Sequence, residues 1–74
     1  MKKLSELKPG ERGVVHTVGG QGPLKRRLVD MGIVPGIAVN VLKVAPLGDP
    51  MEISIRGFNL AIRKEDAARI DVEV

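Results

Sequence analysis

The chain has 74 residues and a formal net charge of +3, and it contains no cysteine, one histidine and one aromatic residue, Phe58. A domain of this size buries only about 60% of the surface that its unfolded chain exposes, so one domain over residues 1–74 without a large enclosed active site is expected. The composition excludes a disulfide framework, a thiolate metal site and a surface of aromatic rings that stack on bases. No apolar run is long enough for a signal peptide or a transmembrane helix, which favours a cytoplasmic protein.

A first strand is expected after a tight turn at Pro9-Gly10, since proline followed by glycine suits the centre of a type II turn. In GVVHTV a period of two predicts that Val14, His16 and Val18 share one face of this strand. We therefore expect His16 to be a core or edge residue. A lone imidazole holds a transition metal weakly, and no second histidine or cysteine is available to join it.

A short helix is predicted after the glycine-rich stretch GGQG, with Pro23 at its first position and Gly32 just past its end. GGQGPL lacks the Lys-Ser/Thr of a phosphate-binding loop, so we interpret it as a strand-to-helix connection. At about 100° per residue, one apolar stripe faces the core, made of Leu24, Leu28 and Met31. Arg27 flanks this stripe, and the outward face carries Lys25, Arg26, Val29 and Asp30.

The basic run at residues 25–27 is either the solvated side of the helix or a contact for an acidic partner. Val29 lies on the same outward side, and an apolar spot rimmed by basic residues is typical of a protein contact. Nucleic-acid binding is not expected, because a net charge of +3 neutralises few phosphates.

Four more strands follow. Pro35-Gly36 repeats the turn before the apolar run 37–45, and residues 51–57 and 59–63 alternate as an antiparallel pair joined through Gly57-Phe58. A helical turn at 64–69 precedes the last strand, 70–74. Short strands with only Val, Ile and Leu to bury favour closure into a barrel, which also hides the sheet edges. We expect a mainly β fold, a small SH3-like five-stranded barrel with one short α-helix after the first strand and a helical turn before the last.

The order and spacing of many short motifs resemble the FeoA family of bacterial ferrous-iron transport accessory proteins. The matching residues are Gly22-Pro23-Leu24, Arg27-Leu28, Met31-Gly32, Pro35-Gly36, the APLGDP of residues 45–50, Gly57, Leu60-Ala61 and Ile70. The resemblance covers nearly the whole chain, and APLGDP between two strands is its most distinctive part. It implies an SH3-like barrel that works in the cytoplasm beside FeoB, a membrane protein that carries a G-protein domain and passes Fe(II) inward.

On this resemblance we expect a non-catalytic accessory protein that binds the cytoplasmic part of a FeoB-type transporter. Fe(II) is the cargo of that pathway, and we expect no cofactor, no metal ligands and no catalytic residues in this chain. The protein would reach the inner face of the membrane only through its partner. The contact surface is expected on the helix and around the proline-bounded loop PLGDP, at Lys25, Arg26, Val29, Leu47, Asp49 and Met51.

Alternatives remain open at this point. The barrel could be a small basic regulatory module that binds nucleic acid, or a metal-responsive regulatory domain in which His16 takes part. Arg26 or Arg27 could supply an arginine finger to the partner's G-protein domain, where a guanidinium stabilises charge on the transferred phosphate. The oligomeric state and the effect on the transporter are not fixed by the sequence.

Overall fold

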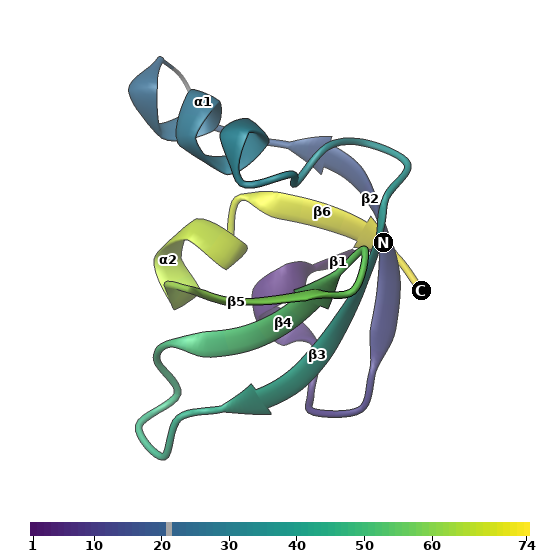
Figure 1. Ribbon diagram of the computed structural model, residues 1–74, viewed down its shortest axis with the longest axis vertical. Helices are drawn as coiled ribbons and strands as arrows, with labels where there is room; N and C mark the ends of the chain where they lie inside the picture. Colours follow the sequence, from purple (N-terminus) through teal and green to yellow (C-terminus); the bar gives the residue numbers. More distant parts are fainter. Residues whose placement is uncertain (21) are drawn as a thin grey trace.

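The computed structural model describes residues 1–20 and 22–74, and Gln21 of the predicted GGQG connection lies outside them (Figure 1). The strands of the described residues are β1 (Lys2–Lys3), β2 (Arg12–Val18), β3 (Ala38–Val44), β4 (Met51–Ile55), β5 (Phe58–Ile62) and β6 (Ile70–Glu73). The helical segments are the 3-10 turn η1 (Leu4–Glu6) and the helices α1 (Pro23–Asp30) and α2 (Lys64–Ala67). All strand pairs are antiparallel, in the order β1-β6-β2-β3-β4-β5.

The sheet curls around a core of aliphatic side chains (Figure 1). This core takes residues from every strand except β1 and from all three helical segments, and its largest fully buried members are Leu4, Leu28, Ile33, Met51, Ile53, Ile70, Val15, Val39, Val41 and Val72. The mainly β prediction is confirmed, with a helix after the first long strand and a helical turn before the last. The strand count of five is corrected to six among the described residues, because the short β1 pairs with β6.

The helix prediction is confirmed at both ends, since α1 begins at Pro23 and ends at Asp30, two residues before Gly32. Leu28 is fully buried, whereas Leu24 and Met31 are half-buried. The apolar stripe therefore faces the barrel as predicted, but only its centre enters the core.

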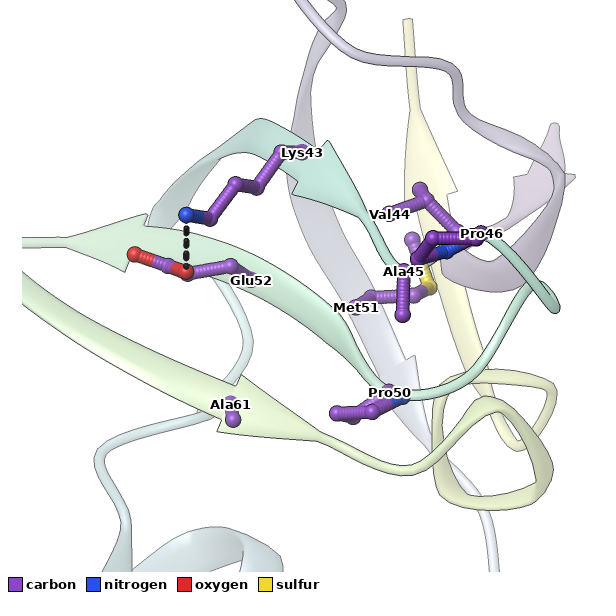
Figure 2. Close-up of a pocket in the computed structure, with 8 residues that line it drawn as sticks. All are labelled: Lys43, Val44, Ala45, Pro46, Pro50, Met51, Glu52 and Ala61. Atoms are coloured by element: carbon purple, nitrogen blue, oxygen red, sulfur yellow. Dashed lines mark ion pairs between the residues drawn. The ribbon is translucent and has the colours of Figure 1, made fainter.

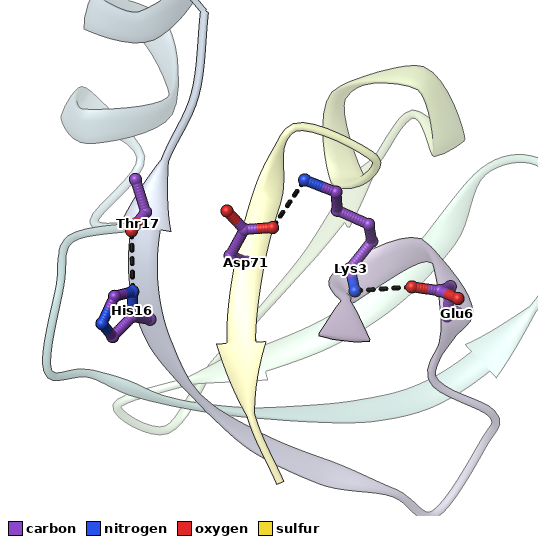
Figure 3. Close-up of polar contacts among 5 residues, drawn as sticks. All are labelled: Lys3, Glu6, His16, Thr17 and Asp71. Atoms are coloured by element: carbon purple, nitrogen blue, oxygen red, sulfur yellow. Dashed lines mark hydrogen bonds and ion pairs between the residues drawn. The ribbon is translucent and has the colours of Figure 1, made fainter. Parts of the chain in front are cut away.

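The prediction that Val14, His16 and Val18 share one face of the first strand is wrong. A register shift between Val15 and Thr17 marks a β-bulge at His16, so Val15 and Val18 are buried while Val14 and His16 are exposed. A bulge adds one residue to one strand of a pair and changes which side chains face inward. The His16 imidazole Nδ1 lies 2.8 Å from the Thr17 hydroxyl oxygen at the surface (Figure 3).

The turn between β4 and β5 is also one residue earlier than predicted. Arg56 and Gly57 form it, with φ of 51° and 84°, and Phe58 is already paired with Ile55. Positive φ at both central residues is the signature of a type I′ turn, whose twist matches that of the flanking strands.

Candidate partner-binding surface

The outward side of α1 presents Lys25, Arg26 and Val29, all exposed, as predicted. Val29 is 40% exposed, and among the described residues neither Lys25 nor Arg26 takes part in an ion pair. The three side chains form an apolar centre with positive charge beside it. This arrangement suits an acidic protein surface that carries an apolar residue.

Arg27 differs from its two basic neighbours because it is bound to the body of the protein. Its guanidinium Nη2 lies 2.8 Å from Oδ2 of Asp66 on α2, and the Asp66 side chain is only 7% exposed. The Arg27 side chain itself remains 59% exposed. A guanidinium that satisfies a buried carboxylate is not free to enter a partner's active site, so this contact weighs against Arg27 as an arginine finger.

The loop between β3 and β4 presents Leu47, which is 96% exposed, at its tip. Asp49 is exposed too, but its carboxylate Oδ1 accepts a hydrogen bond of 3.0 Å from the Lys64 backbone N–H. This N–H is at the first residue of α2 and has no partner within the helix. Asp49 therefore fixes the loop to the start of α2.

Met51 does not belong to the surface. Its side chain is 1% exposed and lies in the core, so the expectation that it forms part of an exposed contact surface is wrong. The alternation of β4 turns Met51, Ile53 and Ile55 inward together, and position 51 is the first of that set. The sequence analysis counted Met51 both in the alternating strand 51–57 and among the contact residues around the loop, and only the strand assignment is confirmed.

A shallow pocket of about 330 Å³ opens beside Met51, on the outer side of the β3–β4 hairpin (Figure 2). Ala45, Pro46 and Pro50 line it, and Ala61 of β5 reaches it from the neighbouring strand. An ion pair of 3.5 Å between Lys43 and Glu52 borders it. Most of the lining is apolar, and its two charges neutralise each other.

The two halves of the predicted contact surface are far apart. In Figure 1, α1 lies at one end of the long axis and the β3–β4 loop at the other. Val29 and Leu47 therefore do not form one continuous patch, and the helix carries the basic part by itself.

Phe58 is a surface residue that the sequence analysis did not assign to a site. It is 72% exposed and borders a second pocket, of about 230 Å³, between the end of α1 and the β4–β5 hairpin. Met31 and Leu60 lie in this pocket, with Asp30 and Arg56 beside them. Phe58 is the only aromatic residue of the sequence and directly follows Gly57 of a tight turn. This position next to a turn could have indicated that its ring is exposed.

The polar contacts near the N-terminus hold the sheet edge (Figure 3). The Lys3 ammonium lies 2.6 Å from Asp71 of β6, and the Lys3 backbone N–H donates to the Glu6 carboxylate at 2.7 Å. Within residues 1–20 and 22–74, no three His, Cys, Asp or Glu side chains gather in a way that could hold a metal ion. No helix in the same part of the chain is both long and apolar enough to cross a membrane.

The family model described as "FeoA domain" matches residues 2–74. The chain is 42% identical over 72 residues to a Porphyromonas gingivalis protein named "Fe(2+) transport protein A/Fe(2+) transporter FeoB fusion protein". This match covers 97% of the chain but only 8% of the fusion protein, so the chain spans a small part of that relative.

Solved structures resemble the fold over almost its full length. The solution structure of FeoA from Chlorobium tepidum is 44% identical with a TM-score of 0.89, and the match covers 97% of this chain and 69% of that one. A Stenotrophomonas maltophilia FeoA crystallised with zinc and described as a prokaryotic SH3 domain protein is 28% identical with a TM-score of 0.85. That match covers 99% of this chain and 91% of the other.

Proposed function

This chain belongs to the FeoA family, with the SH3-like fold of that family, and on that premise we propose that it is a non-catalytic accessory protein of ferrous-iron uptake. In this proposal it binds the cytoplasmic part of a FeoB-type transporter. It resides in the cytoplasm and reaches the membrane through that partner. Fe(II) is the cargo of the transporter, and this chain contributes protein–protein contacts with the transporter.

The fused relative carries the proposal. In that protein, a domain similar to nearly the whole of this chain is joined to FeoB in one polypeptide. A covalent link keeps two domains at a high effective concentration, on the order of millimolar for short flexible linkers. Without such a link, the same task requires a surface that binds the transporter.

The outward side of α1 suits this role. An exposed valine, next to two basic side chains that form no ion pair within residues 1–20 and 22–74, supplies both an apolar contact and a charge that attracts an acidic surface. Because this surface lies on a helix that packs on the barrel through Leu28, it is presented rigidly and costs little ordering on binding.

The proposal is tested by recording amide NMR spectra of the labelled protein while the soluble cytoplasmic domain of the FeoB-type transporter from the same organism is added. The titration is run with and without guanine nucleotide, with random duplex DNA as a control. Shifts centred on α1 support the proposal, and a dependence on nucleotide would favour an arginine finger from Arg26.

Two results would overturn the proposal. The first is no response to the transporter domain together with broad, salt-sensitive shifts on DNA, since log affinity from phosphate contacts falls with log salt. The second is a change confined to the surroundings of His16 on addition of a divalent ion, with no response to the transporter domain, which would indicate a metal-responsive domain.

A further inference from the structure

The sheet has an open edge at β5, its last strand. Arg56 and Gly57 form a two-residue turn, so Ile55 and Phe58 close the hairpin as a hydrogen-bonded pair. Because such pairs alternate along an antiparallel ladder, every second residue of β5 directs its backbone N–H and C=O away from β4. On β5, the backbone N–H and C=O groups that point away from β4 belong to Asn59 and Ala61.

The same alternation holds across the next strands. Val41 on β3 exchanges hydrogen bonds with Glu11 and Gly10, at 2.9 and 2.8 Å, on the side opposite β4. Val41 is paired with Ile53, and Ile53 with Leu60. Leu60 therefore points its backbone groups toward β4, and its neighbours Asn59 and Ala61 point theirs outward.

Asn59 and Ala61 are exposed, and within the described part of the chain no backbone hydrogen bond from a turn, loop or cap reaches either residue. Their N–H and C=O groups can thus accept another strand. Unpaired edges of this kind are templates for strand addition.

The side chains beside this edge indicate what an added strand should carry. The pocket of about 230 Å³ lies next to β5, and its half-buried Met31 and Leu60 pack against the core. Alternate residues of an added strand would face this pocket. Apolar side chains at those positions would cover Met31, Leu60 and the exposed ring of Phe58.

The charges at the two ends of β5 are both positive. Arg56 precedes the strand and Arg63 follows it, both are exposed, and neither is in an ion pair within residues 1–20 and 22–74. A second copy paired antiparallel about Leu60 would set Arg56 opposite Lys64, and like charges directly opposite each other destabilise a strand pair. A segment with carboxylates at its ends fits instead.

We propose that the outer edge of β5 binds an extended segment of a partner protein by strand addition, and that this segment carries acidic residues on either side of alternating apolar residues. The inference rests on the proposed function in taking a protein as the partner, and it adds a contact surface separate from the outward side of α1. Backbone hydrogen bonds to Asn59 and Ala61 set the register of the added segment. Arg56 and Arg63 favour negative charge at the two ends of that segment.

The test uses the intact protein and the blocked peptide Glu-Thr-Val-Thr-Val-Thr-Glu. Hydrogen exchange of the Asn59 and Ala61 amides should slow by about tenfold or more on saturation, because these N–H groups become hydrogen-bonded. Two control peptides have the same length, one with N-methyl groups on alternate amides and one with lysine at both ends. Each should bind more weakly than the acidic peptide.

Two variants test the same interaction from the protein side. Ala61→Pro removes an outward N–H at a position where an edge strand tolerates proline, and it should abolish the protection of Asn59. The double variant Arg56→Glu, Arg63→Glu keeps the backbone edge and should reverse the preference toward the lysine peptide, by roughly two- to fivefold for each end. The double variant gives a result even if Ala61→Pro fails to fold.

The inference is overturned if the acidic peptide leaves the exchange of Asn59 and Ala61 unchanged, or if N-methylation does not weaken binding. It is equally overturned if the acidic peptide is not preferred over the lysine peptide. The function proposed above has a separate readout, the NMR shifts of the α1 amides on addition of the transporter domain. The transporter domain can produce these shifts when the peptide does not bind, and the peptide can bind when the transporter domain produces no shifts.

Discussion

The guanidinium of Arg27 on α1 and the buried carboxylate of Asp66 on α2 are joined at 2.8 Å, across 39 positions of sequence. The two helices that interrupt the strand order are thereby connected to each other. This contact adds to the packing of Leu28 in holding α1, with the candidate surface on its outward side, against the barrel.

Arg27→Ala should lower the free energy of unfolding by about 1–2 kcal/mol. Loss of one partner from a buried pair costs roughly 3–5 kcal/mol, and the exposed Arg27 side chain means that water already screens part of this interaction. Urea unfolding measures the change. Arg26→Ala is the matched control, since Arg26 is exposed and unpaired among the described residues, and it should stay within about 0.5 kcal/mol of the parent protein. Equal effects of the two substitutions would contradict a structural role for the Arg27 contact.

Val29→Asp should weaken binding of the transporter's cytoplasmic domain by about tenfold or more and leave the fold intact. The new carboxylate puts a charge into the apolar centre of the contact, where loss of a central residue costs on the order of 2 kcal/mol. Isothermal titration calorimetry measures the affinity, and the amide spectrum verifies the fold. Leu47→Asp introduces the same charge at the opposite end of the barrel. A comparable loss with Leu47→Asp would mean that the partner also contacts the loop tip.

Met51→Ala should destabilise the protein by about 2–5 kcal/mol, because it opens a cavity in a core that cannot fully collapse. Thermal and urea unfolding measure the loss, with Leu47→Ala at a fully exposed position as the control. The folded fraction of the Met51→Ala variant should bind the transporter domain with unchanged affinity. A variant that kept its stability but lost its affinity would place Met51 at the contact after all.

Asp49→Ala should cost about 0.5–2 kcal/mol of stability, as for other side chains that accept a hydrogen bond at a helix start. Asp49→Asn keeps an oxygen acceptor and should recover most of that loss. The recovery separates the hydrogen bond from the charge. Amide exchange at Lys64 reports on the contact directly, and it should quicken in Asp49→Ala alone.

Local signals predicted much of the fold. Pro23 and Gly32 bound α1 because their backbone restrictions act within a few residues, and the alternation of β4 placed Ile53 and Ile55 in the core for the same reason. The family resemblance extended these local predictions to the correct barrel.

The errors have a different origin, since they depend on contacts between distant segments. The bulge at His16 arises where β2 pairs with β6, and the short β1 exists because Lys2 and Lys3 find partners in the same strand. Whether residues 25–29 and 47–51 share a face is likewise decided by the curl of the sheet. Periodicity within one strand carries no information about any of these.

The pairing of Lys2 with Val72 brings the beginning and the end of this barrel together at one edge of the sheet. A polypeptide can therefore enter and leave the domain at nearly the same point. The barrel can be attached at either end or inserted inside a longer chain with little rearrangement, and a circular permutant that is joined across these ends and opened at the β3–β4 loop should still fold. The fold is thus equally compatible with a domain that diffuses alone and with one that is tethered to a larger protein.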